Sequence, residues 1–335
     1  MKRFLALLLA FALPAGCASA RSQAQPTAEN TFFAMDTVMT LRLYGGGDET
    51  LLAEAEERVR ALEGLLSVTD GGSEVYALNH AGSAELSPET AELLDTALGL
   101  CERTGGALDI SIYPVLRAWG FTTGACAVPG ADTIAALLPR VDYRKVELDG
   151  NAAALPDGME IDLGSVAKGY AGETLAAWLK ERGAASALLD LGGNIQTVGA
   201  RPDGSPWRVG VRDPAGEGNI GVVEVTDQAV VTSGGYERYF EEDGVRYWHI
   251  LDPKTGAPAR SGLASVTVVG DSGVVCDALS TALFVMGREG ALAHWRQHRD
   301  FEAVLVSEDG GITVTAGLEG RFTPAEKGRA LTVAE

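Results

Sequence analysis

The spacing of apolar residues predicts two amphipathic helices near the start of the chain. Segment 49–67 places an apolar residue every three or four positions, which lines one face of a helix. The residues of that face are Leu52, Ala55, Val59, Leu62 and Leu66. A second helix is expected over 87–106, with Ser87 as N-cap, Pro88 at the first helical position and glycine at the end.

Runs of β-branched and aromatic residues predict strands between and after further helices. The strand segments are 31–45, 185–200 (strand, Gly-rich turn, strand), 207–211, 221–225, 229–232, 247–251 and 264–269, and helices are expected over 166–182 and 277–286. Strands and helices occur in mixed runs without a regular βαβ alternation. The pattern therefore predicts an α+β fold, with mixed, largely antiparallel sheets and packed helices, in one large domain over 31–330.

The first 20 residues have the features of an export signal. Two basic residues precede an apolar run and then small residues around Cys17, and the run is too short to span a bilayer as a mature helix. The stretch "PAGC" resembles the bacterial lipoprotein box, which predicts cleavage before Cys17 and acylation of that cysteine. Cleavage at "ASA", residues 18–20, is the alternative. Residues 21–30 would be a flexible tether, and the domain would stand lipid-anchored on the outer face of the cytoplasmic membrane.

Charge and cysteine content narrow the class of protein. The 27 basic against 46 acidic residues give a net charge of −19, which argues against a nucleic-acid surface. Cys101, Cys126 and Cys276 show no paired spacing typical of a disulfide framework or a zinc site. Buried thiols are expected, with a Cys101–Cys126 bridge left open.

The stretch "IDLGSVAKGYA", residues 161–171, is the first candidate for chemistry. Lys168 is expected in the first turn of its helix, where the helix dipole disfavours a cation and favours an anion. A phosphate held by the helix-start amides and Lys168 would resolve that conflict. The alternative is an ordinary helix capped by Asp162 or Ser165, with Lys168 in solvent.

The stretch "CDALSTALFVMG" supplies a second candidate. Asp277 and Thr281 are four residues apart, so on a helix their oxygens face the same way. Two hard oxygen ligands suit Mg²⁺, which completes its shell with water and substrate phosphate. The alternative is a helix cap at Asp277 followed by a threonine without a ligand role.

Three further motifs carry polar residues in apolar or turn-forming surroundings. His249, in "YWHILDPKTG", can act as a general base or be structural. Asp109 interrupts a predicted apolar strand in "GGALDISIYP", and "VVTSGGYERYF" joins a Gly-Gly turn to aromatic residues. Met35 and the aromatic residues Tyr113, Trp119 and Tyr236 can line a flat ligand or belong to the core.

Together, the motifs resemble those of the ApbE family, the FAD:protein FMN transferases, over about residues 31–329. The matching landmarks, in order, are "FAMDTVMT", "SEVYALN", "GALDISIYPV…WGF", "IDLGSVAKGYA", "LLDLGGNI", "VVTSGGYERYF", "HILDPKTG" and "DALSTALFVMG". The resemblance implies Mg²⁺-dependent transfer of FMN from FAD to a threonine hydroxyl of an acceptor protein, with release of AMP. It also implies that the acceptor is a membrane electron-transport subunit carrying a motif close to Asp-x-x-Thr-(Ser/Gly)-Ala-Thr. No such motif occurs in this chain.

The resemblance also implies roles for particular residues. Ser165, Asp277 and Thr281 would be metal ligands, and His249, Asp277 and Lys168 would be catalytic. The flavin-binding positions would be Met35, Ala107, Leu108, Asp109, Asp162, Lys168, His249 and Leu251. This sequence departs from the pattern at Ser280, where some members have an acid, and at Asp36, where many have glycine.

Two other functions use the same residues. In an FAD pyrophosphatase, water would replace the acceptor threonine, giving FMN and AMP. A flavin-binding lipoprotein would hold FAD without turnover, but simple binding needs no metal pair such as Asp277 and Thr281.

Overall fold

The fold is α+β, as predicted, and is built on one large sheet. The computed structural model describes residues 25–326 and 330–335, so the predicted signal and lipoprotein box at 1–20 lie outside the described residues. The sheet order is β1-β2-β6-β7-β10-β13-β14-β15-β17, antiparallel throughout except for the last pair, β15 and β17. The largely antiparallel sheet predicted from the sequence is therefore confirmed.

The strands of the large sheet come from both ends of the chain. They are β1 (Ala28–Ala34), β2 (Thr37–Leu43), β6 (Ala187–Asp190), β7 (Asn194–Val198), β10 (Ala229–Gly234), β13 (Leu263–Gly270), β14 (Glu302–Ser307), β15 (Ile312–Thr315) and β17 (Leu331–Ala334). Smaller sheets are formed by β3 (Ser83–Glu85), β4 (Glu147–Asp149) and β5 (Ala152–Ala154), by β8 (Trp207–Arg212), β9 (Asn219–Val225) and β16 (Phe322–Pro324), and by β11 (Tyr239–Glu242) with β12 (Val245–Trp248).

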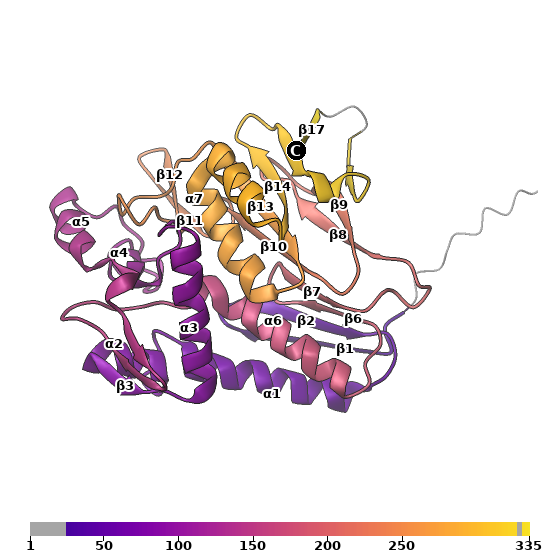
Figure 1. Ribbon diagram of the computed structural model, residues 1–335, viewed down its shortest axis with the longest axis horizontal. Coiled ribbons are helices and arrows are strands. Elements are labelled where there is room, and N and C mark those ends of the chain that lie inside the picture. The colour runs from indigo at the N-terminus through magenta and orange to yellow at the C-terminus, as the bar shows by residue number, and fades with distance from the viewer. Residues whose placement is uncertain (1–24, 327–329) are drawn as a thin grey trace, which may run out of the picture.

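The helices cover one face of the large sheet. The α-helices of the described residues are α1 (Glu49–Leu66), α2 (Glu74–Ala81), α3 (Pro88–Arg103), α4 (Tyr113–Ala118), α5 (Ala131–Leu137), α6 (Gly164–Glu181) and α7 (Gly273–His298). Figure 1 shows α6 and α7 lying across the strands, with α1 below them and α2, α4 and α5 at one end. None of the helices in the described part of the chain has the length and hydropathy to cross a bilayer.

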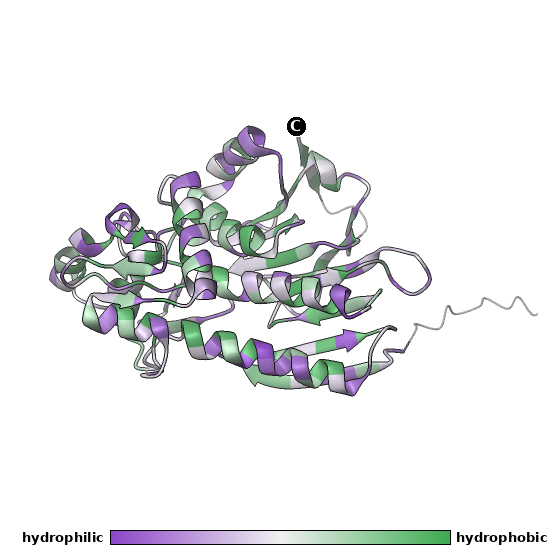
Figure 2. Ribbon diagram, turned by 60° about the horizontal axis from the view of Figure 1, so that its bottom comes forward, coloured by the Kyte–Doolittle hydropathy of each residue, from purple (hydrophilic) through white to green (hydrophobic). Residues whose placement is uncertain are grey.

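Successive side chains of the central strands point to opposite faces of the large sheet, so each strand contributes to two layers of the core. Val231 of β10 and Val268 of β13 pack with α7, whereas their neighbours Val230 and Val269 pack against β8, β9 and β16. The central strands are therefore buried on both faces, with helices on one side and the small sheet on the other, whereas the outer face of β1 and β2 is exposed. The predicted apolar face of α1 is confirmed, because all five of its predicted residues are buried. Hydropathy changes along α1 as expected for a helix with one exposed face (Figure 2).

Several predicted boundaries are wrong for local reasons. The single strand 31–45 is a hairpin, because Met35 and Asp36 adopt left-handed backbone angles (φ 48° and 59°) and reverse the chain. The first strand also begins at Ala28, within the segment expected to be a tether. Asp109 is not in a strand but caps a short 3₁₀ helix, Ile110–Ile112. The last helix begins at Gly273, capped by Ser272, so Asp277 is not its cap.

The three cysteines of the described residues are free thiols. Cys101 and Cys276 are buried, as expected, but Cys126 is exposed. The Cys101–Cys126 bridge left open by the sequence is not formed.

Candidate functional site

A large cavity lies where the helical layer, the large sheet and the β11–β12 hairpin meet. Its volume of about 1130 Å³ is slightly above the usual range for ligand pockets. Every residue predicted for the site lines it: Met35, Ala107, Leu108, Asp109, Asp162, Ser165, Lys168, His249, Leu251, Asp277 and Thr281. The fold thus brings together residues that are far apart in the sequence.

The start of α6 supplies Lys168 and two polar neighbours to the cavity. Asp162 precedes the helix, and its Oδ1 accepts a hydrogen bond from the Gly164 amide at 2.8 Å. Burial raises the pKa of Asp162, while the Gly164 amide and the cations Arg238 and Lys168 oppose that rise. The helix begins at Gly164, so Lys168 is in its second turn, one turn later than predicted, and Leu163 rather than Asp162 or Ser165 is the N-cap.

The second turn of α7 places Asp277 against α6. The Asp277 carboxyl is 6% exposed, and its Oδ2 accepts a hydrogen bond from the Gly169 amide at 2.8 Å. Gly169 has no room for a side chain, since a Cβ there would lie 2.2 Å from the Gly273 carbonyl oxygen. Burial raises the pKa of Asp277 to about 6, opposed by Lys168 and by backbone hydrogen bonds. The close contact of the two helices therefore fixes the carboxylate at the cavity wall.

One helical turn further, Thr281 faces the same cavity and connects to β10. Its hydroxyl lies 3.3 Å from the Ser233 hydroxyl, which also contacts the buried Ser280 hydroxyl at 2.8 Å. Ser280 is occupied by this contact and by the Asp277 carbonyl oxygen. Asp277 and Thr281 are thus the members of "DALST" that line the cavity.

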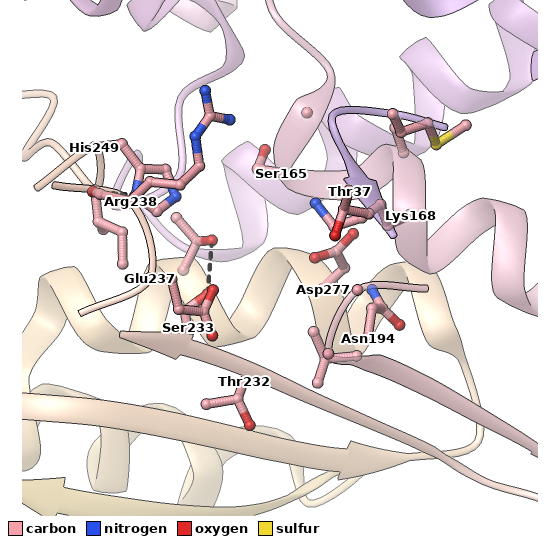
Figure 3. Close-up of a pocket in the computed structure, with 18 of the residues that line it drawn as sticks. Thr37, Ser165, Lys168, Asn194, Thr232, Ser233, Glu237, Arg238, His249 and Asp277 are labelled. Carbon is pink, nitrogen blue, oxygen red and sulfur yellow. Dashed lines mark hydrogen bonds between the residues drawn. The ribbon is translucent and has the colours of Figure 1, made fainter. Parts of the chain in front are cut away.

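His249 follows β12 and approaches the cavity from the opposite side (Figure 3). Its Nδ1 is 3.2 Å from the Arg238 carbonyl oxygen. A carbonyl oxygen only accepts, so this bond requires the tautomer with the proton on Nδ1, leaving a lone pair on Nε2. Burial lowers the pKa of His249 to about 4, and the nearby cations Arg238 and Lys168 act in the same direction. His249 is therefore neutral at pH 7.

The loop before α4 contributes its backbone and apolar side chains. Asp109 accepts hydrogen bonds from the Ser111 amide and hydroxyl and from the Tyr143 amide, so its carboxylate is used inside the protein. Burial raises the pKa of Asp109 despite these bonds. Asp109 therefore contributes to the cavity only as part of its wall, beside Ala107 and Leu108. Of the aromatic candidates, Tyr236 lines the cavity, whereas Tyr113 and Trp119 are buried elsewhere in the core.

The cavity also contains charged residues that the sequence patterns do not single out. Glu237 and Arg238 come from the motif "VVTSGGYERYF", which stands out in the sequence only for its turn and aromatics. Arg208 and Arg212 lie on β8 and belong to no motif, because only the packing of the small sheet brings them to the cavity. Burial raises the pKa of Glu237 to about 7, opposed by Lys168 and Arg212. Within the described part of the chain, four cationic side chains therefore line the cavity of an acidic protein.

The donor set fits a hard divalent cation. The described residues hold no cluster of three or more His, Cys, Asp or Glu suited to a metal. A buried carboxylate and a hydroxyl one turn apart, at a cavity wall, match a cation that keeps much of its shell for water and ligand oxygens. Ser165 lines the cavity from the start of α6 and is the remaining hydroxyl of the predicted set. Mg²⁺ is compatible with these residues.

Fold and site define an α+β protein with a large cavity that is lined by both acidic and basic side chains. The chain belongs to the ApbE family, whose sequence pattern matches residues 35–305. A Klebsiella pneumoniae protein named FAD:protein FMN transferase is 33% identical over 302 residues, covering 88% of this chain and 93% of its own. A Treponema pallidum protein of the same name is 36% identical over 310 residues, covering 85% and 86%. The crystal structure of the ApbE protein from Thermotoga maritima has a TM-score of 0.83 at 32% identity, covering 88% and 98%.

Proposed function

We propose that this protein is an FAD:protein FMN transferase, which moves FMN from FAD to a threonine hydroxyl of an acceptor protein and releases AMP. Relatives of that name match most of the chain. The observation that carries the proposal is the cavity itself, which joins Lys168 and Asp277 on one side to His249 on the other and is also lined by Thr281. This arrangement suits a diphosphate and an attacking alcohol.

In the proposed reaction, the threonine oxygen attacks the phosphorus of the FMN half of FAD. A new phosphorus–oxygen bond forms, the bond to the bridging diphosphate oxygen breaks, and AMP leaves with that oxygen. Such transfer depends mainly on alignment and on neutralising charge, which Lys168 and the arginines of the cavity supply.

His249 is the proposed acceptor of the threonine proton. Its Nδ1–H is held by the Arg238 carbonyl oxygen, so Nε2 is free to take a proton. The lowered pKa keeps the ring neutral at physiological pH. A neutral imidazole near a cluster of cations is a weak base, so we expect the step to depend on a well-placed threonine.

Asp277 and Thr281, with Ser165, are the proposed ligands of Mg²⁺. When bound, the cation neutralises charge on the diphosphate oxygens. In its absence, the buried Asp277 carboxylate lies next to the site where an anionic ligand would bind and opposes that binding. We therefore expect FAD to bind more weakly after treatment with EDTA.

The acceptor and the location belong to the same proposal. We infer that the acceptor carries the threonine motif of the family and is a membrane electron-transport subunit. A lipid anchor at Cys17 would hold the enzyme at the outer face of the cytoplasmic membrane, where it meets such subunits. Mass spectrometry of the mature N-terminus distinguishes acylated Cys17 from cleavage at 18–20.

The test combines the purified protein with FAD, Mg²⁺ and a tagged acceptor carrying the threonine motif. In-gel flavin fluorescence at the acceptor band, with AMP released in equal amount and with no label when the threonine is changed, is the expected result. Asp277→Asn should lower the transfer rate by at least about a hundredfold, because it removes the charged ligand. The matched control is Asp95→Asn, an exposed carboxylate on α3, which should keep the wild-type rate.

Two other outcomes lead to different functions. Free FMN and AMP without a labelled acceptor would indicate an FAD pyrophosphatase. Intact bound FAD without either product would indicate a flavin carrier, and full activity of Asp277→Asn would remove the metal assignment.

A further inference from the structure

Asn194 is a buried polar residue without a partner at the wall of the cavity. It is 3% exposed, and neither its side-chain nitrogen nor its side-chain oxygen has a hydrogen-bond partner among the described residues. An unpaired buried amide is costly, because it loses its hydrogen bonds to water and gains none in return. In an enzyme cavity, a ligand that supplies the missing partners removes this cost.

The fold fixes the position of this amide. Asn194 is the first residue of β7, and its carbonyl oxygen accepts from the Leu191 amide at 2.9 Å across the turn between β6 and β7. The turn needs left-handed angles at Gly192 and Gly193, and Gly192 lies against Thr37 of β2. The backbone that carries the Asn194 side chain is therefore fixed by the strand and the turn.

Its neighbours in the cavity are the groups proposed to bind phosphate and cation. On β10, Val231 is directly opposite Asn194, and Ser233 is two residues further on, so Asn194 and Ser233 are diagonal on the same sheet face. The Ser233 hydroxyl contacts Thr281 at 3.3 Å. Figure 3 shows Asn194 below and to the right of Asp277, on the same side of the cavity as Lys168. The amide thus faces the charged end of the site.

We propose that Asn194 is a substrate-binding residue that holds the diphosphate of the dinucleotide. Its NH₂ group would donate to a phosphoryl oxygen next to Lys168, and its oxygen would accept from a water of the bound cation or from a ligand hydroxyl. The inference rests on the proposed function, since it takes the ligand to be a dinucleotide. It adds a neutral donor to the cationic groups of the site.

The test uses the purified full-length protein with three variants. Asn194→Leu has nearly the same shape but no polar atoms, and Asn194→Asp keeps an acceptor but replaces the donor with a negative charge. The control is Asn79→Leu, because Asn79 is fully paired: it donates to the Ile161 carbonyl oxygen at 2.8 Å and accepts from the Ile161 amide at 2.7 Å. Melting temperature is measured without ligand, and affinity by calorimetry with FAD and Mg²⁺, and with inorganic pyrophosphate and Mg²⁺.

Without ligand, Asn194→Leu should melt at or above the wild-type temperature, because it removes unpaired buried atoms, whereas Asn79→Leu should melt lower. Asn194→Leu should weaken binding of both FAD and pyrophosphate at least about tenfold. Asn194→Asp should weaken them further, because it places an anion where the diphosphate binds.

Three results would overturn the inference. A lower melting temperature for Asn194→Leu with unchanged affinities would make Asn194 structural. Weaker FAD binding with unchanged pyrophosphate binding would mean that the amide contacts a base or the flavin ring instead. Equal affinity of Asn194→Asp and wild type would exclude a donor role. If the wild type binds FAD but labels no acceptor, the proposed function fails while these comparisons remain decisive.

Discussion

At the scale of single residues, the environment of the site sets the protonation of its side chains. Lys168 and Arg238 share the cavity with four titratable side chains, Asp162, Glu237, Asp277 and His249. Burial raises the pKa of the three carboxyl groups and lowers the pKa of the imidazole, so it favours the neutral form of each. The charged forms of these four side chains are therefore costly, and binding of the proposed cation and diphosphate would change their protonation.

His249 gives a prediction about pH. A histidine with an ordinary pKa of about 6.5 would lose roughly nine-tenths of its neutral form at pH 5.5. Because burial lowers the pKa of His249 to about 4, the single-turnover transfer rate should change less than about twofold between pH 7.5 and 5.5. The measurement uses saturating FAD and Mg²⁺, because the bound cation would keep Asp277 ionised, whose pKa is otherwise raised by burial to about 6. It is repeated in the Glu237→Gln background, because burial raises the pKa of Glu237 to about 7.

The lowered pKa of His249 also makes the stability of the folded protein depend on pH. Between about pH 6.5 and 4 the unfolded chain protonates this histidine and the folded protein does not, so its contribution to stability falls as pH falls through that window. His249→Gln should lower the transfer rate by about 10²–10⁴-fold and should remove this dependence. A rate for the wild type that halves near pH 6.5 would contradict the assigned protonation state.

At the scale of elements, the contact between α6 and α7 determines where the reactive groups lie. Gly169 and Gly273 allow the two helix backbones to approach closely, and the Gly169 amide holds the Asp277 carboxylate. Lys168, adjacent to Gly169 on α6, lines the cavity with Asp277 of α7. The close approach of α6 and α7 therefore determines where Lys168 and Asp277 lie in the cavity.

Gly169→Ala tests this contact. The new Cβ would lie 2.2 Å from the Gly273 carbonyl oxygen and 2.6 Å from the Asp277 Cβ, so the helices must separate. We expect a loss of about 1–3 kcal/mol in the free energy of unfolding and a strong loss of FAD and Mg²⁺ binding. Urea denaturation and calorimetry measure the two effects.

A matched glycine on α1 separates packing from helix propensity. Gly64 is exposed, and a Cβ added there would meet no atom of the described residues within 4 Å. Gly64→Ala should therefore stabilise the protein by about 0.5–1 kcal/mol and leave binding unchanged. If Gly169→Ala behaved like Gly64→Ala, the close contact would not control the site.

Apolar periodicity is enough to predict α1, α3, α6 and the central strands, because burial dictates their pattern. For α7 it finds only 277–286 of Gly273–His298, which has non-helical angles at Gly287. It cannot locate the reversal at Met35 and Asp36, since two non-glycine residues with left-handed angles have no apolar signature. Motif chemistry finds the residues that line the cavity from α6 and α7. It misses Arg208 and Arg212, whose approach depends on how the small sheet packs, and Asn194, whose lack of a partner among the described residues is visible only in three dimensions.

At the scale of the whole molecule, the cavity joins parts of the fold that are far apart in the sequence. Met35 comes from the β1–β2 hairpin, His249 follows β12, and Thr281 belongs to α7. A ligand that contacts all three ties the helical layer, the large sheet and the outer hairpin together. Ligand binding should therefore stabilise the protein as one unit.

FAD with Mg²⁺, at about a hundred times its dissociation constant, should raise the free energy of unfolding by about 2.7 kcal/mol. The gain should appear as one shifted transition in differential scanning calorimetry, and EDTA should reverse most of it. Hydrogen exchange should slow in the β1–β2 hairpin, α6 and α7 together. Slower exchange in only one of them would mean that the ligand does not bridge the cavity.

Because the chain is synthesised from its N-terminus, the residues that line the cavity become available at different times. A ribosome releases Met35 early, but the wall formed by Asp277 and Thr281 comes only with α7, and β14, which pairs with β13, follows it. A nascent chain that ends before α7 therefore lacks the proposed cation ligands Asp277 and Thr281. The cavity wall is complete only once α7 has been synthesised and packed against α6.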